Sequence, residues 1–187
     1  MVGIRGFLLI MVASLALVGC GLGGGSASTA APAASGASDD AFQRGLAAQQ
    51  ANKPDDAIRL YYQALAADPS NKFALYNLGL IEQTRSHAVS AEAWYRLALE
   101  NDKNMPEPLY NLALIREAVP DFNDEIGLLK RLIAIQPNNA PAHWHLGVAY
   151  RGLGQTTDAN TEFATAQRLD ARLTPPPAST VRPSATR

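Results

Sequence analysis

Small and apolar residues along the chain predict pairs of short helices. The clearest pair lies between residues 142 and 170, where Gly147 and Tyr150 precede a turn at Gly154. Ala159 and Phe163 follow the turn at a spacing that places both on one face of a second helix. A small residue on each helix lets the two helices cross closely, which is typical of an αα-hairpin.

The same pattern recurs at a constant interval of 34 residues, for example from Gly45 to Gly79. A single hairpin cannot bury its own apolar faces, so the pattern predicts a stack of hairpins. Three rows of residues keep this interval through four repeats, without insertion or deletion. The rows are Gly45, Gly79, Ala113 and Gly147; Tyr61, Tyr95, Leu129 and Phe163; and Ala64, Ala98, Leu132 and Ala166.

The order of these residues resembles the signature of the tetratricopeptide repeat, in which Trp, Leu-Gly and Tyr are followed by Ala, Phe, Ala and Pro. The resemblance implies an all-α fold, a right-handed α-solenoid of four helix-turn-helix hairpins over residues 39–171. The four repeats are expected at about residues 38–71, 72–105, 106–139 and 140–173.

The third repeat departs from this pattern. Glu125 stands where the other repeats have Ala57, Ala91 and Ala159. A carboxylate at a close helix crossing is expected to tilt outward or to find a partner, because burying an unpaired charge is costly. The second helix of this repeat is therefore expected to be looser or rotated.

The start of the chain, up to Cys20, resembles the signal of a bacterial lipoprotein. Arg5 precedes an apolar run, Phe7–Val18, that is too short for a permanent membrane span. Residues 17–20 read LVGC, which resembles a lipobox. The resemblance implies that residues 1–19 are a signal peptide removed before Cys20, and that diacylglycerol is attached to the Cys20 sulfur. No cofactor other than this covalent lipid is expected. The alternative is an ordinary signal peptide with a chance cysteine.

The lipid expected on Cys20 also indicates which membrane the protein is attached to. Several acyl chains on one cysteine hold a protein at a membrane, whereas a single chain holds weakly. Residue 21 is glycine, so the aspartate that retains many lipoproteins in the inner membrane is absent. In an organism with two membranes, the resemblance implies attachment to the outer membrane, facing the periplasm.

The segments on either side of the repeats lack a core-forming pattern. Residues 20–38 are expected to be the lipidated cysteine and a flexible tether rich in Gly, Ala and Ser. Residues 174–187 are expected to be a disordered, Pro-rich tail. Such a tail cannot cover the last hairpin, so an apolar edge is expected to be left for a partner, for a second copy in a homo-oligomer or for its own polar neighbours to cover. That edge includes Leu153, Phe163 and Leu169.

Composition narrows the classes of partner. A net charge of −1 and a pI near 6.3 give no basic excess, so the sequence does not favour nucleic-acid binding. The chain has one cysteine, which excludes an intramolecular disulfide.

Two rows at the same interval lie early in the first helix of each repeat, where the family resemblance places a concave groove. The aromatic row is Phe42, Tyr76, Tyr110 and Trp144, and the polar row is Gln43, Asn77, Asn111 and His145. Amides match the donors and acceptors of a peptide backbone, and aromatic rings add apolar contact area. These eight residues are the candidate peptide-binding site. The alternative for the tyrosines is a structural one, with each ring wedged between neighbouring hairpins.

One sub-class of the family grips the terminal carboxylate of a peptide with basic residues in the groove. The corresponding positions here are not basic, so an internal peptide segment is the more natural ligand. These positions are Gln50, Thr84, Ala118 and Gly152.

Catalysis and metal binding find little support in the sequence. His143 and His145 lie two residues apart, whereas pairs of metal ligands on one helix use spacings of three or four. No phosphate loop and no nucleophile–base pair is recognisable, so neither an enzyme nor a metal site is predicted.

Two functions are compatible with these features. The first is a lipid-anchored scaffold that binds a protein or peptide partner in the cell envelope, in assembly of a pilus or secretin or of a peptidoglycan-synthesis complex. The second is a regulatory or accessory subunit of an envelope enzyme or transporter. Both rest on analogy, because a fold does not by itself give a function.

Overall fold

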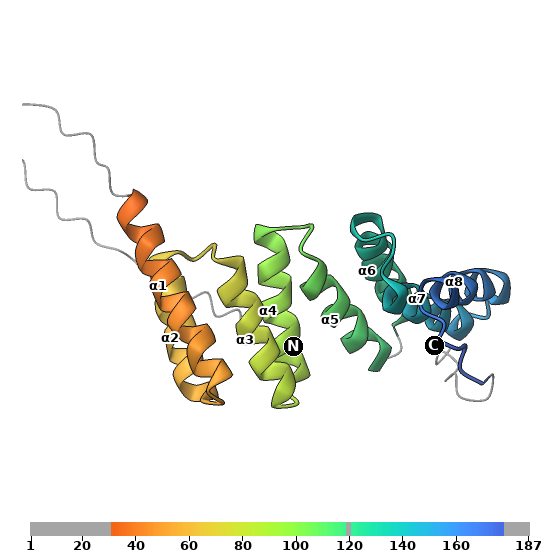
Figure 1. Cartoon of the computed structure of the whole chain (residues 1–187), viewed down its shortest axis with the longest axis horizontal. Coiled ribbons are helices and arrows are strands. Elements are labelled where there is room, and N and C mark those ends of the chain that lie inside the picture. The colour runs from red at the N-terminus through yellow and green to blue at the C-terminus, as the bar shows by residue number, and fades with distance from the viewer. Residues whose placement is uncertain (1–30, 119–120, 178–187) are drawn as a thin grey trace, which may run out of the picture.

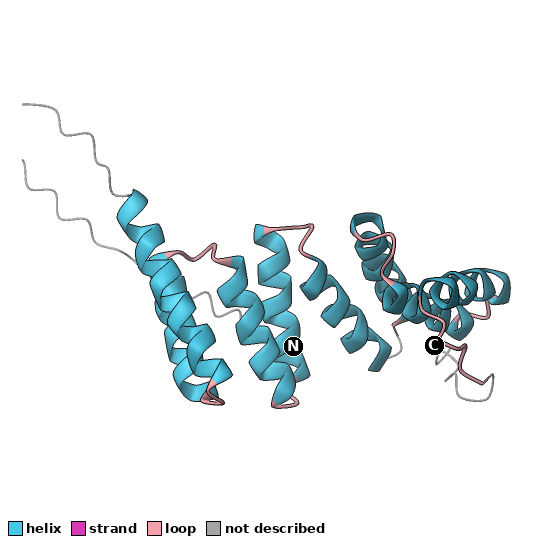
Figure 2. Cartoon of the chain, in the orientation of Figure 1, coloured by secondary structure: helices cyan, strands magenta, loops and turns pink. Residues whose placement is uncertain are grey.

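The computed structural model describes residues 31–118 and 121–177, with side chains from residue 35 onward. Within these ranges the chain forms helices and loops and no strand (Figure 2). The helices are α1 (Ala31–Gln50), α2 (Pro54–Ala67), α3 (Lys72–Thr84), α4 (Ala88–Asn101), α5 (Pro106–Ala118), α6 (Phe122–Ile135), α7 (Ala140–Gly152) and α8 (Thr156–Leu169).

The helices form four hairpins stacked in sequence order (Figure 1). Each helix packs against the helix before it and the helix after it. The first hairpins stand upright in Figure 1, whereas α7 and α8 run across the view, so the stack turns along its length. The predicted all-α solenoid of helical hairpins is confirmed.

Local sequence signals explain where the helices begin. Pro54 opens α2, where the missing N–H costs nothing. The side chains of Asn71 and Asn139 cap α3 and α7, each accepting a hydrogen bond of 3.0 Å from the backbone N–H three residues later. These caps satisfy donors that the first helical turn leaves unpaired.

The turns of the first, second and fourth hairpins each have one residue with a positive φ angle. Asn52, Ser86 and Gly154 lie at equivalent positions and have φ angles of 56°, 63° and 76°. The equivalent residue of the third repeat is Pro120, which lies outside the described residues.

The predicted close helix crossings are present. A Cβ atom added at Gly45 would lie 2.5 Å from the ring of Tyr61, and one added at Gly79 would lie 2.5 Å from the ring of Tyr95. Both tyrosines are fully buried. The small residue of the first helix therefore makes room for an aromatic ring of the second.

The first helix begins earlier than the sequence predicted. Residues 20–38 were expected to be a tether, but α1 starts at Ala31. Ser38 is 1% exposed, and its Oγ accepts a hydrogen bond of 2.9 Å from Asn71 Nδ2. The alanine-rich composition that suggested a flexible coil also has high helix propensity, and packing against the start of α3 favours the helix. The predicted signal peptide and Cys20 lie outside the described residues.

Glu125 in α6 does not tilt outward as predicted. Its exposed fraction is 0%, and neither carboxyl oxygen has a hydrogen-bond partner among the described residues. Burial, and secondarily the nearby Glu117 carboxylate, raise the pKa of Glu125 from its ordinary value of 4.5 to about 8. The carboxyl group is therefore neutral at pH 7 in the folded chain.

The edge of the last hairpin is less open than predicted. Phe163 is 2% exposed, because its ring fills the space above Gly147 and the Arg151 guanidinium lies 4.3 Å from the ring centroid. Leu153 and Leu169 are half-buried. Of the expected ways to cover this edge, Phe163 is covered by its own hairpin and by a polar neighbour, Arg151.

Candidate peptide-binding face

The aromatic row lies along the first helices of the four hairpins, and each of its side chains is half-buried. We call the surface formed by this row and the polar row the ladder face; its residues are Phe42, Tyr76, Tyr110 and Trp144, with Gln43, Asn77, Asn111 and His145. The ladder face runs across α1, α3, α5 and α7.

Three of the aromatic side chains rest on the buried ring of their own hairpin. The ring centroids lie 5.9 Å apart for Phe42 and Tyr61, and 5.8 Å apart for Tyr76 and Tyr95. Trp144 meets Phe163 edge-on at 6.3 Å. These contacts give the aromatic row a structural role, while its half-exposed surfaces remain available to a ligand.

Tyr110 differs because Leu129 replaces the aromatic ring in the third hairpin. Its ring instead meets the His145 imidazole of the next repeat edge-on, with centroids 5.6 Å apart. Burial, followed by the Glu117 carboxylate, raises the Tyr110 pKa. Burial is also the main cause of the raised pKa of Tyr76. Both phenols are therefore neutral and able to donate at pH 7.

The polar row is not a uniform ladder of exposed amides. Gln43 is exposed, but Asn77 is 8% exposed and its Nδ2 donates to the Phe73 carbonyl of the same helix at 2.8 Å. Asn111 is half-buried and donates to Tyr95 Oη at 3.3 Å. Asn77 therefore offers little surface to a peptide, because its position turns toward the packed side of α3.

A further row, not recognised from the sequence, lies at the inner edge of the ladder face. Gln49 Oε1 accepts a hydrogen bond of 2.7 Å from Tyr61 Oη, and Gln83 Oε1 accepts one of 2.5 Å from Tyr95 Oη. The equivalent residues of the third and fourth repeats are Glu117 and Arg151. Since these hairpins have Leu129 and Phe163 in place of the tyrosine, both charged side chains make other contacts.

The start of the C-terminal tail lies on the α7 end of the ladder face. Trp144 Nε1 donates to the Thr174 carbonyl at 2.8 Å, and Arg151 Nη1 donates to the Pro176 carbonyl at 2.5 Å. The two donors are seven residues apart, so they lie two turns apart on one helix face. The described part of the tail is therefore held and not free as predicted, whereas residues 178–187 lie outside the described residues.

Arg151 was missed by sequence reasoning. The basic positions of the carboxylate-gripping sub-class correspond to Gly152 in this repeat, one residue further along the chain. The signal that identifies Arg151 is the repeat interval, which relates it to Gln49 and Gln83.

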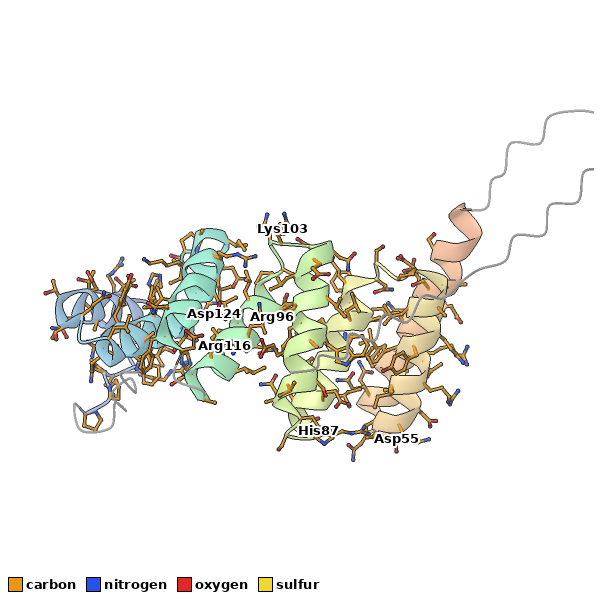
Figure 3. The ribbon with its side chains drawn as sticks, turned by 180° about the vertical axis from the view of Figure 1, so that it is seen from behind. Asp55, His87, Arg96, Lys103, Arg116 and Asp124 are labelled. Atoms are coloured by element: carbon orange, nitrogen blue, oxygen red, sulfur yellow. The ribbon has the colours of Figure 1, made fainter. Side chains whose placement is uncertain are left out.

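A second surface carries charged groups from α4, α5 and α6 (Figure 3). Arg116 donates to Glu92, its Nε lies 3.0 Å from Asp124, and Arg96 Nε lies 2.9 Å from Glu92. A shallow cleft of about 570 Å³ lies nearby between apolar side chains and a rim of Arg96, Lys103 and Arg131. The ion pairs join three helices and are explained by that structural role.

None of the described helices combines the length and the apolar character needed to cross a membrane.

The hairpin stack and the ladder face define an all-α repeat protein of the α-solenoid class. A model of the tetratricopeptide repeat family matches residues 42–106. The other hairpins continue the same fold.

Known proteins support this assignment. A photosystem I assembly protein, Ycf3 of Cyanophora paradoxa, is 34% identical over 80 residues, which is 41% of this chain and 46% of that protein. The chain spans less than half the length of the curated relatives it matches. The crystal structure of MamA has a TM-score of 0.65 at 21% identity, covering 72% of this chain and 79% of that one. YrrB, described as a tetratricopeptide repeat protein with an unusual peptide-binding site, has a TM-score of 0.65 at 19% identity, with coverages of 70% and 68%.

Proposed function

We propose that this protein is a non-enzymatic scaffold whose ladder face binds an extended peptide segment of a partner protein. The observation that carries the proposal is the docking of the chain's own tail. Trp144 and Arg151 donate to two backbone carbonyls of an extended, Pro-rich segment, at Thr174 and Pro176. A surface that binds backbone carbonyls in this way is suited to an extended peptide of the same kind.

The family supports the same function. Tetratricopeptide repeat proteins mediate protein–protein interactions, and YrrB is described by its peptide-binding site. The relative from Cyanophora paradoxa is an assembly protein. We extend these roles to this chain as a scaffold that positions a partner during assembly of a larger machine.

The finer part of the proposal concerns location. The lipobox-like residues 17–20 support lipid attachment through Cys20. In an organism with two membranes, Gly21 supports attachment to the outer membrane, with the repeats facing the periplasm. The machine is then one of the cell envelope, either a pilus or secretin or a peptidoglycan-synthesis complex.

The experiment is photo-crosslinking in membranes. A photo-reactive residue replaces Gln43, which is exposed on the ladder face, or Arg59, a control on the exposed surface of α2. Capture is then repeated in a variant with Trp144→Phe and Arg151→Met, which removes both tail-binding donors while keeping apolar contact area at both positions. The matched control for the tryptophan change is Trp94→Phe.

We expect one envelope protein to be captured from position 43 and not from position 59. The donor variant should lower this capture several-fold, whereas Trp94→Phe should leave it unchanged. Equal capture from both positions, or capture that does not respond to the donor variant, would contradict binding at the ladder face.

A further inference from the structure

Three polar side chains from three successive helices meet at one end of the ladder face, to which His145 belongs. They are Glu117 of α5, Glu125 of α6 and His145 of α7, and one ligand atom from each lies within 4.8 Å of the others. His145 Nδ1 lies 2.8 Å from Glu117 Oε2. Ligand atoms bound about 2.0–2.1 Å from a tetrahedral ion lie about 3.3 Å apart, so a small adjustment would bring all three to one ion.

Glu125 is the part of this cluster that packing alone does not explain. It is 0% exposed, and both of its carboxyl oxygens lack a hydrogen-bond partner among the described residues. The other hairpins place alanine at this crossing, so the fold does not require a carboxyl group there. A buried polar group without a partner calls for an explanation, and a bound ion is one of the few available.

We propose that Glu117, Glu125 and His145 bind one divalent transition-metal ion of the Zn²⁺ class. Carboxylate oxygen and imidazole nitrogen are borderline ligands that suit Zn²⁺ and its neighbours. The ion neutralises the two carboxylates and gives the Glu125 oxygens a partner. Three protein ligands leave a fourth position for water or for a donor from another molecule.

The cluster has an entry path and a defined structural effect. The side chains of Glu117 and His145 are 32% and 17% exposed, so an ion reaches Glu125 from their side. The ion would join α5, α6 and α7, and thereby fix the third hairpin to the fourth. Binding of an ion here does not require peptide binding, although His145 belongs to the ladder face.

The other two histidines provide internal controls. His143 Nδ1 lies 2.6 Å from Glu162, but its Nε2 contacts the Pro137 carbonyl at 3.0 Å. His87 Nδ1 lies 2.9 Å from Glu82 on an exposed surface. Within the described residues, only the His145 cluster brings three metal-ligand side chains this close together.

The test measures Zn²⁺ binding to the full-length chain after removal of metal with a chelator. Every protein carries Cys20→Ser, because the single cysteine is a competing ligand. Calorimetry and thermal unfolding compare the parent with Glu125→Gln, which keeps the shape of the side chain, and with His143→Gln, which removes a histidine outside the cluster. Circular dichroism verifies that each variant is folded.

We expect the parent to bind one Zn²⁺ and its Tm to rise by roughly 5–10 °C at an excess of about 100-fold over Kd. Glu125→Gln is expected to weaken binding by at least about 100-fold, since loss of a residue that merely supports a ligand already costs about 10–100-fold. His143→Gln should bind like the parent. Failure of the parent to bind, or equal binding by the parent and Glu125→Gln, would overturn the proposal.

A second measurement locates the ion. Trp144 lies beside the cluster, with its ring centroid 5.0 Å from that of His145. In a Trp94→Phe background, Trp144 is the remaining tryptophan of the chain's two. Paramagnetic Co²⁺ bound at the cluster should quench its fluorescence, and Zn²⁺ should restore it by competition. Binding of Co²⁺ without quenching would place the ion elsewhere and contradict the site.

Discussion

Glycine in the middle of α3 is predicted to be required by the ring that faces it. Replacing Gly79 with alanine would place a Cβ atom 2.5 Å from Tyr95 Cε1 and 2.6 Å from Cδ1. Tyr95 is fully buried, and its hydroxyl donates to Gln83, so the ring is fixed at both ends. The alanine methyl group therefore fits only if α3 and α4 move apart.

Two opposing terms set the size of the effect. Alanine is favoured over glycine inside a helix by about 1 kcal/mol. Overpacking a tight core costs about 1–3 kcal/mol. The difference between the two terms is about 0–2 kcal/mol, so we expect Gly79→Ala to lower the free energy of unfolding by up to about 2 kcal/mol. Gly127→Ala in α6 is the matched control, because nothing lies within 4 Å of its added Cβ, and it should stabilise by about 0.5–1 kcal/mol.

The third repeat shows how the clash can be relieved. It pairs Ala113 with Leu129 where the second repeat pairs Gly79 with Tyr95. Tyr95→Leu alone should destabilise the chain, but Gly79→Ala added to it should be neutral or stabilising. The coupling energy in this double-mutant cycle is expected to be about 1–3 kcal/mol.

Urea unfolding of the four proteins measures that coupling. If Gly79→Ala costs the same with leucine as with tyrosine at position 95, the ring is not the reason for glycine, and the account of the close crossing is wrong. A destabilising Gly127→Ala would instead show that the assumed helix propensity does not apply in this array.

Three other changes test separate features. The Glu125 pKa is raised from 4.5 to about 8. In metal-free protein, the contribution of this carboxyl group to the free energy of unfolding is therefore complete below pH 4.5 and is lost as the pH rises through 8. At about 1.4 kcal/mol per pKa unit the loss is on the order of 5 kcal/mol. Glu125→Gln should remove this fall in the free energy of unfolding with rising pH. An unchanged pH dependence would show that other groups cause it. Asn77→Ala should cost about 1 kcal/mol, because it removes a buried hydrogen bond, whereas Gln43→Ala on the exposed surface should cost less than about 0.5 kcal/mol; equal urea midpoints would contradict the burial of Asn77. Cys20→Ser should abolish labelling by a palmitate analogue and membrane attachment, and attachment that persists without labelling would refute the lipobox.

The repeat array could be predicted because its signals are local and recur. Helices α3, α5 and α7 begin at Lys72, Pro106 and Ala140, the positions predicted for the second, third and fourth repeats. Caps, prolines and small residues act within a few positions of where they stand, so sequence alone places them. The start of α1 could not be placed in this way, because alanine suits both a flexible linker and a helix.

The candidate site was predictable only as rows of equivalent positions. The constant repeat interval identifies the aromatic and polar rows, but not which members are free to bind. That depends on helix rotation and on the neighbouring hairpin, which bury Asn77 and leave Gln43 exposed. The tail contacts of Trp144 and Arg151 needed the fold as well, because they join residues 30 and 25 positions apart.

The departures of the third repeat form one structural unit. In the first two repeats, the hydroxyl groups of Tyr61 and Tyr95 donate hydrogen bonds to the polar residues at the inner edge of the ladder face, Gln49 and Gln83. Leu129 has no hydroxyl, so Glu117 is released from that role and turns to His145 instead. Glu125 then replaces the alanine of the other hairpins at the same place. Leu129 leaves this position without a hydroxyl, which frees Glu117, and Glu125 is buried beside it. Without a ligand between them, burying these carboxyl groups would cost free energy. A bound ion would pair with both Glu117 and Glu125 and so offset that cost. The metal-binding measurement distinguishes a bound ion from unpaired burial.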